Sequence, residues 1–209
     1  MTASPADQSR SALEVLVSVG PLISQIPSDD DGFPTSDLAE HWRLRGCGIA
    51  CLRMILSTYG TDHGSYWSLV NEGLDAGAYC DRGWIHQGLV DVAFRYGVAG
   101  WARRDRTIGQ LCDELIAGHL VIASVTVCFR GGQAQADSPD KVHSPGGHLV
   151  LVTGARLTST GEPTELRVHH PSATVANNLS DHWVAHEQFS ASFSGNFMAF
   201  PEPASTAAT

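Results

Sequence analysis

The sequence has little positive charge. It contains 13 Lys and Arg residues against 22 Asp and Glu residues, so its formal net charge is −9 at pH 7. The densest basic stretch, residues 103–106, is short and is interrupted by Asp105. Nucleic acids and anionic membrane surfaces bind clustered Lys and Arg, so neither is an expected partner. The overall acidity favours a basic or neutral substrate instead.

The sequence also lacks a cysteine framework. Its five cysteines, at positions 47, 51, 80, 112 and 128, are odd in number and widely spaced, and they include no Cys-x-x-Cys pair. This pattern argues against a disulfide scaffold and against a structural zinc site. It fits a protein of a reducing compartment.

No signal peptide, membrane span or nucleotide motif is evident. No basic segment precedes the first apolar run, and that run, residues 12–26, contains Glu14 and is interrupted by Gly20 and Pro21. It is therefore neither a secretion signal nor a transmembrane helix, and we expect a cytoplasmic protein. No Gly-x-Gly-x-x-Gly or P-loop motif is present, so no nucleotide is expected, and no other cofactor is indicated.

Length and composition indicate one domain with loose ends. The chain has 209 residues, of which 43% are hydrophobic and 17% are charged, as in ordinary globular proteins. Residues 1–38 are expected to form an N-terminal extension, disordered at its start and helical over residues 12–26. The main domain spans residues 39–200, and residues 201–209 form a flexible tail.

The predicted elements run from helices to strands. Residues 120–128 are too apolar for a half-exposed strand and belong in the middle of a sheet. Residues 158–163 predict a hairpin turn between two further strands. The expected helices are 36–42, 47–59, 65–74, 84–96, 108–117 and 184–193, and the expected strands are 120–128, 148–154, 165–170 and 196–200. This order predicts an α+β fold with an antiparallel sheet.

Cys47 stands at the start of an apolar helix. Hydrophobic residues recur at three- and four-residue steps as far as Tyr59, and Gly60 is typical of a helix end. Unpaired backbone N–H groups and the helix dipole favour a negative charge in the first turn, so a thiolate would be stabilised there. The small Gly46 would leave room for a substrate backbone. Cys51, one turn later on the same face, is expected to be a buried core residue.

A long polar segment separates the predicted central strand from the next one. Residues 130–147 are rich in Gly and Pro, and loops of this length in compact domains are usually functional or disordered, so we interpret the segment as a lid over the site. Within it, His143 and Gly147 are candidates for substrate binding. His148 then opens a buried strand, which would expose its ring at the end of the sheet.

Three motifs in this order resemble the C39-like peptidase family, whose fold is papain-like. They are residues 47–54 for the nucleophile helix, residues 146–154 for the histidine strand and residues 169–172 for the third position. Residues 111–125 and 186–189 resemble the intervening and closing elements of the family, and the resemblance covers residues 39–200. It implies a cysteine-dependent amide-bond hydrolase in which His148 pairs with Cys47.

The chain departs from the family at two positions. The family usually has Asp or Asn before the proline of the third motif, and this chain has His170, with His169 beside it. A neutral His170 can still accept a hydrogen bond from His148, but it supplies no negative charge. Active relatives often have Gln six residues before the nucleophile to bind the oxyanion, and here that position is His41.

Other functions remain compatible with the sequence. The expected partner is a peptide or small amide, and an acyl transferase or ligase would use the same acyl-enzyme. A peptidase-like module that binds peptides without cutting them is the alternative that His170 favours. Cys47, His148 and His170 could also bind zinc, but the preferred interpretation is that the site holds no metal. The sequence does not indicate the oligomeric state.

Overall fold

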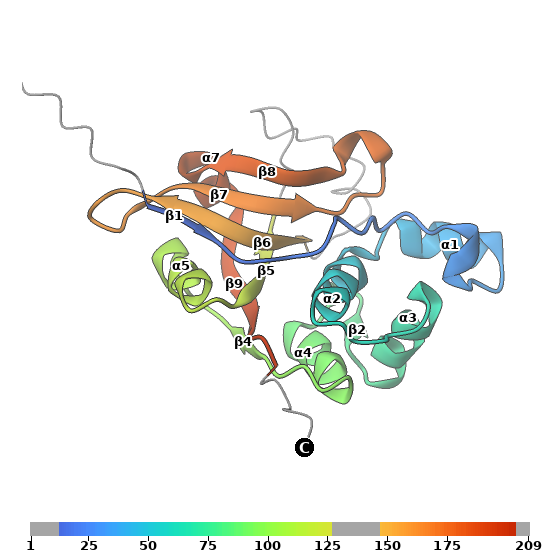
Figure 1. Cartoon of the computed structure of the whole chain (residues 1–209). Coiled ribbons are helices and arrows are strands. Elements are labelled where there is room, and N and C mark those ends of the chain that lie inside the picture. The colour runs from blue at the N-terminus through green and yellow to red at the C-terminus, as the bar shows by residue number, and fades with distance from the viewer. Residues whose placement is uncertain (1–12, 127–146, 204–209) are drawn as a thin grey trace, which may run out of the picture.

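The computed structural model describes residues 13–126 and 147–203. Within these ranges the chain forms one seven-stranded antiparallel sheet with helices on both of its faces, together with a separate two-stranded hairpin (Figure 1). The strand order is β4-β9-β5-β6-β7-β8, and β1 pairs with β6. The predicted α+β fold class is confirmed.

The helices occupy the segments that the hydrophobic spacing predicts. They are α1 (Ser36–Arg43), α2 (Cys47–Thr58), α3 (Tyr66–Asp75), α4 (His86–Arg95), α5 (Ile108–Ile116) and α7 (His186–Ser192), with short 3-10 helices at Asp29–Asp31 and Val175–Asn177. Three of them begin at a hydroxyl residue, because the side chains of Thr35, Ser65 and Thr107 accept a hydrogen bond from a backbone N–H of the first turn. Helix α2 has no such side-chain cap.

The strands belong to the main sheet, apart from β2 and β3, which form the separate hairpin. They are β1 (Leu13–Leu16), β2 (Tyr79–Cys80), β3 (Gly83–Trp84), β4 (Trp101–Arg103), β5 (Leu120–Val125), β6 (His148–Leu157), β7 (Pro163–His170), β8 (Leu179–Ala185) and β9 (Phe193–Phe200). Strand β5 lies between β6 and β9, which confirms its predicted central position.

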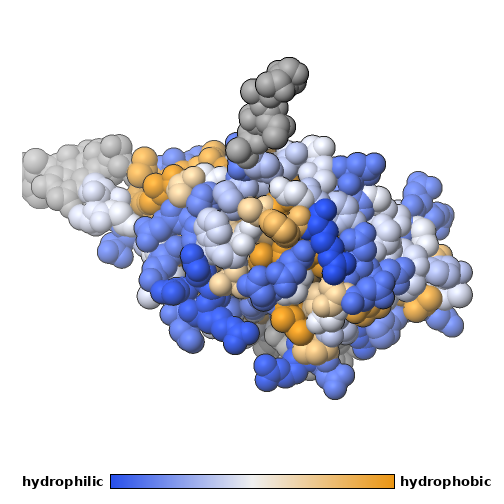
Figure 2. All heavy atoms as spheres, turned by 90° about the horizontal axis from the view of Figure 1, so that it is seen from below, coloured by the Kyte–Doolittle hydropathy of each residue, from blue (hydrophilic) through white to orange (hydrophobic). Residues whose placement is uncertain are grey.

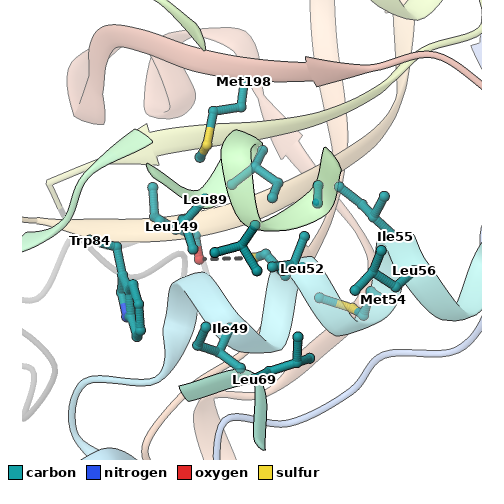
Figure 3. Close-up of a cluster of buried hydrophobic side chains, with 14 of the residues drawn as sticks. Ile49, Leu52, Met54, Ile55, Leu56, Leu69, Trp84, Leu89, Leu149 and Met198 are labelled. Atoms are coloured by element: carbon teal, nitrogen blue, oxygen red, sulfur yellow. Dashed lines mark hydrogen bonds between the residues drawn. The ribbon is translucent and has the colours of Figure 1, made fainter. Parts of the chain in front are cut away.

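Alternation along the central strands divides the hydrophobic residues between two cores. One face of the sheet packs against α2, α3 and α4 (Figure 3), and the other packs against α5 and α7. The first face carries Leu120, Ile122, Leu149, Leu151, Met198 and Phe200, and the second carries Val121, Ala123, Val125, Val150, Val152, Phe197 and Ala199. A continuous apolar strand is required because both of its faces are covered.

One helical prediction is wrong and another has shorter bounds than predicted, and both differences concern strands of the sheet. Residues 12–26 are not a helix, since Leu13–Leu16 form β1 against the second half of β6 and the following residues are irregular. Alternating valines at 15, 17 and 19 fit the two-residue period of a strand. The pairing with β6 favours this period over the helical one. The helix predicted over 184–193 is shortened to His186–Ser192, because β8 ends at Ala185 and β9 begins at Phe193.

Several short elements have no clear sequence signal. Strands β4 and β8 and the β2–β3 hairpin were not predicted, and Trp84 belongs to β3 instead of the helix that follows it. The predicted hairpin turn between the second and third strands is confirmed by the antiparallel pairing of β6 and β7. The segment interpreted as a lid lies outside the described residues, except for Gly147.

The described surface has only scattered hydrophobic side chains. Seen from below, it is mainly hydrophilic, with small and separate hydrophobic patches (Figure 2). The large hydrophobic side chains that are exposed in the described ranges are Leu13, Leu16, Leu74, Ile85, Phe94, Ile116 and Val175. None of the helices within those ranges is long and apolar enough to cross a membrane.

Candidate active site

Cys47 is the first residue of α2, and its side chain is 5% exposed. The residue before the helix is Gly46, so no side chain caps the first turn. The first N–H groups of an α-helix have no partner within the helix, and they carry the positive end of its dipole. A thiolate at this position therefore lies in a favourable field, as the sequence predicted.

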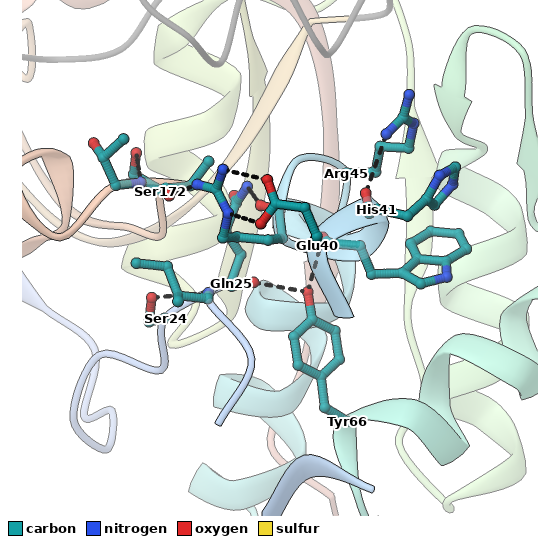
Figure 4. A network of polar contacts seen from close by, with 12 residues as sticks. Ser24, Gln25, Glu40, His41, Arg45, Tyr66 and Ser172 are labelled. Carbon is teal, nitrogen blue, oxygen red and sulfur yellow. Dashed lines mark hydrogen bonds and ion pairs between the residues drawn. The ribbon is translucent and has the colours of Figure 1, made fainter. Parts of the chain in front are cut away.

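The turn that precedes Cys47 is held by three buried side chains from distant segments. The Gln25 amide donates to Arg43 O at 2.7 Å, and the Trp84 indole N–H donates to Arg45 O at 2.7 Å. The Tyr66 hydroxyl lies 3.1 Å from Gln25 O and 3.5 Å from Trp42 O (Figure 4). These bonds fix the backbone path into α2, and with it the position of the thiol.

The glycines on either side of Cys47 make room for protein side chains. A Cβ at Gly46 would lie 1.5 Å from the Tyr66 hydroxyl oxygen, and a Cβ at Gly48 would lie 2.7 Å from the Trp84 ring. Close packing with Tyr66 and Trp84 therefore explains both glycines without a substrate. A substrate-binding role for Gly46 stays a prediction.

The start of α2 lies beside the start of β6. The thiol of Cys51 donates to Leu149 O at 3.5 Å (Figure 3). Cys51 is one helical turn from Cys47, and Leu149 is the residue after His148, so the bond brings the two predicted reacting residues into the same region. Cys51 is fully buried, and burial, followed by the nearby Cys47, raises the pKa of its thiol well above the usual value.

His148 and His170 come together where β6 begins and β7 ends. Both are buried, at 4% and 0% exposure, and their ring centroids are 4.6 Å apart with the planes tilted by 47°. Antiparallel neighbours place the first residue of one strand near the last residue of the other, which explains the pairing. The Nδ1 of His170 lies 2.8 Å from Asn177 O. Because a carbonyl only accepts, that nitrogen carries the proton in the neutral ring.

His169 is committed to a structural role. Its Nε2 donates to Gly20 O at 3.1 Å, and its Nδ1 accepts from the backbone N–H of Asp181 at 3.1 Å. It pairs with Leu151 in the register, so it lies on the face of the sheet that packs against α2. Burial lowers the pKa of His169, whereas Asp181 opposes that shift. Of the two adjacent histidines, His170 is the one beside His148.

The remaining predicted site residues are dispersed or lie outside the described ranges. His41 is exposed on α1, and its ring packs edge to face against Trp42, with the two ring centroids 5.3 Å apart. Burial and the neighbouring Arg45 lower the pKa of His41. Gly147 has a φ of 100°, and a Cβ there would lie 3.0 Å from Val125 O. His143 is not among the described residues.

The other described thiols differ in burial, since Cys51 and Cys112 are buried and Cys80 is exposed. None of the four described cysteines is in a disulfide, and burial raises the pKa of Cys112 to about 12. No group of three or more His, Cys, Asp and Glu side chains in residues 13–126 and 147–203 is arranged to hold a metal ion. The zinc interpretation of Cys47, His148 and His170 therefore gains no support there.

Sequence reasoning missed the residues that support the site. Four such residues come from separate segments. The side chains of Gln25, Tyr66 and Trp84 bond to backbone carbonyl groups at or near the turn before Cys47, and the carbonyl oxygen of Asn177 accepts a hydrogen bond from the His170 ring. Such contacts have no fixed spacing along the chain. The one available signal is Gly-Cys-Gly itself, because paired glycines indicate a backbone that other atoms approach closely.

Comparisons of sequence find no relative: no family model and no curated protein matches the chain. Solved structures do match. A protein from Bacillus anthracis described as a C39-like peptidase is 16% identical, with 90% of this chain and 98% of that chain covered and a TM-score of 0.57. A double glycine motif protease from an AMS/PCAT transporter, solved with its leader peptide, is 16% identical, with 91% and 95% covered and a TM-score of 0.53.

A third matching structure belongs to a longer chain. UfSP from C. elegans is 13% identical, and the match covers 95% of this chain but 36% of that one, with a TM-score of 0.55. Identities this low show a shared fold and not a shared activity. The chain thus has the papain-like fold of C39-type cysteine peptidases, as its motifs predicted.

Proposed function

We propose that this protein is a cysteine peptidase that cleaves peptides or small amides through an acyl-enzyme. The observation that carries the proposal is the junction of α2 and β6. Cys51, one turn after Cys47 at the uncapped start of α2, bonds to the carbonyl oxygen of Leu149, the residue after His148, and the buried His148 ring lies beside His170. A solved protein of this fold holds its leader peptide, which supports a peptide as the substrate class. The four described cysteines, at positions 47, 51, 80 and 112, form no disulfide, which supports a reducing, cytoplasmic setting.

In the proposed reaction His148 takes the proton of Cys47, and the thiolate attacks the carbonyl carbon of the substrate. The helix start stabilises the thiolate before attack. The tetrahedral oxyanion is stabilised by the Cys47 backbone N–H, with His41 as the proposed second donor. His148 then protonates the leaving amine, and water, activated by the same ring, releases the acid product.

In this mechanism His170 positions the His148 ring and stays neutral. Two positive rings with centroids 4.6 Å apart would repel by about 4 kcal/mol at an effective dielectric constant of 20. The Nδ1 proton of His170 is held by Asn177 O, so its Nε2 is the acceptor that it can offer. A neutral acceptor stabilises the imidazolium less than a carboxylate does, so we expect a modest rate.

The test compares three proteins: the wild type, Cys47→Ala and Cys112→Ala. Cys112 is a buried cysteine on α5 and provides the matched control. We expect the wild type and Cys112→Ala to cleave members of a mixed peptide library, detected by mass spectrometry, and Cys47→Ala to cleave none. Cleavage by Cys47→Ala would exclude the proposed nucleophile.

A second measurement separates the peptidase from a non-catalytic peptide-binding module, which the histidine at position 170 favours. An activated Cys47 should react with iodoacetamide at pH 6 about 10-fold faster than Cys80 or more, because only the thiolate reacts. Equal rates, together with peptide binding and no cleavage, would favour the binding module. Adding an amine and searching for the amide product distinguishes acyl transfer from hydrolysis.

A further inference from the structure

A cavity of about 500 Å³ opens between the helical half of the molecule and the sheet. One wall is the β2–β3 hairpin with the start of α4, which contributes Arg82, Trp84 and His86. The other wall is the sheet side, which contributes Arg104, Ser124 and Asn196. The volume is in the range of pockets that hold small ligands or one or two side chains of a peptide.

The cavity adjoins both halves of the proposed active site. Trp84 packs against Gly48, the residue after Cys47, and its indole bonds to Arg45 O before Cys47. Figure 3 shows Trp84 at the end of α2 that carries Ile49, opposite the end that carries Ile55 and Leu56.

The other wall leads to the histidine strand. Ser124 precedes Val125, and Val125 pairs with His148 in the register of β5 and β6. A peptide that reaches Cys47 through this opening would place neighbouring residues in the cavity.

The lining is cationic although the protein is acidic. Arg82 and Arg104 face the same space from opposite walls, and none of the lining residues in the described ranges is Asp or Glu. In the described part of the chain neither arginine forms an ion pair with a carboxylate, whereas Arg43, Arg53, Arg156 and Arg167 all do. Burial, followed by Arg104, lowers the pKa of His86 at the same wall, which also places the Arg104 charge near that ring.

We infer that this cavity binds a carboxylate of the substrate close to the bond that is cleaved. The carboxylate belongs to a Glu or Asp side chain or to the C-terminus of the peptide. Two guanidinium groups on opposite walls bind it through charge-assisted hydrogen bonds, with Ser124 and Asn196 as neutral donors. The inference rests on the proposed function. It gives this cavity a preference for acidic groups, which is opposite to the preference for basic or neutral substrates that the net charge of −9 suggests for the whole protein.

The test uses peptide electrophiles, so that turnover is not required. Chloroacetyl peptides and peptidyl chloromethyl ketones carry Glu or Gln at one of the three positions next to the electrophile, and the chloroacetyl peptides are made with either an amidated or a free C-terminus. Labelling of Cys47 is timed by intact-protein and peptide mass spectrometry. The proteins are the wild type, Arg82→Gln/Arg104→Gln and Arg95→Gln, in which an exposed arginine outside the cavity is neutralised.

We expect the Glu form at one position, or the free C-terminus, to label wild-type Cys47 about 3-fold to 10-fold faster than its neutral match, as partly exposed ion pairs allow. The double variant should lose this preference, and Arg95→Gln should keep it. Iodoacetamide should label Cys47 at the same rate in all three proteins. Comparing side-chain with terminal carboxylates identifies the source.

Two results would overturn the inference. One is equal labelling by the Glu and Gln forms at every position. The other is a preference that survives in the double variant, since the cavity would then not be its cause. Failure of the proposed function is a separate result, in which Cys47 reacts no faster with iodoacetamide than Cys80 and no peptide is cleaved.

Discussion

The two proposed reacting residues are held in different ways. The backbone before Cys47 is fixed by side chains from three distant segments, Gln25, Tyr66 and Trp84, which bond to the carbonyl groups of Arg43, Trp42 and Arg45. His148 is fixed by the register of a strand that pairs with β5, and its ring lies against His170 from the end of β7.

The two residues are therefore positioned by two different kinds of interaction. Strand register follows from alternation, so the sequence can position His148 through a local pattern. The turn before Cys47 depends on buried contacts that a local pattern does not show. Substitutions at the histidines should therefore change catalysis with little change in stability, and substitutions around the turn should change both.

The largest effect is expected at His148. His148→Gln keeps a polar side chain at the start of β6 but removes the base and acid, so kcat should fall by about 1,000-fold. Thermal unfolding should show a nearly unchanged midpoint. His182→Gln, on strand β8, is the control and should keep full activity. A loss of less than 10-fold in His148→Gln would remove this residue from the mechanism.

Next is Gly46→Ala, which tests the turn. Its new Cβ would lie 1.5 Å from the Tyr66 hydroxyl, and the forced movement should lower the free energy of unfolding by about 3 kcal/mol and reduce activity as well. Gly109→Ala provides the control, because its Cβ would meet nothing closer than 3.7 Å and alanine favours a helix. Urea unfolding measures both variants, and equal midpoints would refute the packing argument.

A smaller effect is expected from His170→Ala, which removes the ring beside His148 but leaves both reacting groups. We expect kcat to fall by about 10-fold to 100-fold with KM little changed. His170→Asn, which can still accept a hydrogen bond, should recover part of the rate. If His170→Ala is as active as the wild type, the ring contact has no role in positioning His148.

The smallest effect concerns stability at low pH. The buried His169 has a lowered pKa when folded, so the unfolded chain binds its proton first as the pH falls. The contribution of neutral His169 is complete above about pH 6.5 and decreases below it. Between pH 7 and pH 5 the wild type should therefore lose more stability than His169→Gln, as measured by urea unfolding at several pH values. Parallel stability curves for the two proteins would contradict this assignment.

The sequence predicts the long elements of this fold because each has a strong period. The apolar stripe of α2 and the unbroken run of β5 follow from burial, so both were found within a few residues of their true bounds. Residues 13–16 were misread because a four-residue strand leaves too few residues to distinguish two periods. Short edge strands such as β4 depend on their partner, and the partner is decided only in the folded chain.

The candidate site was predictable in part for the same reason. Cys47 and His148 mark the beginnings of a helix and a strand, and element beginnings are visible in a sequence. The choice between His169 and His170 depends on which face of β7 each ring occupies, and it is the contacts with Gly20, Asn177 and Asp181 that favour His170. Their contacts span up to 149 positions along the chain.

The two glycines around Cys47 also affect how a mutational scan of this protein would be interpreted. Positions 46, 47 and 48 should all reject substitution, and the block would resemble a single catalytic motif. Two of the three rejections arise from the Tyr66 and Trp84 side chains, which occupy the space that a Cβ would need. A scan in the background of a smaller residue at 84 should therefore increase tolerance at position 48 and leave position 47 as intolerant as before, whereas position 46 should stay restricted because a Cβ there would also lie 2.8 Å from Trp42 O.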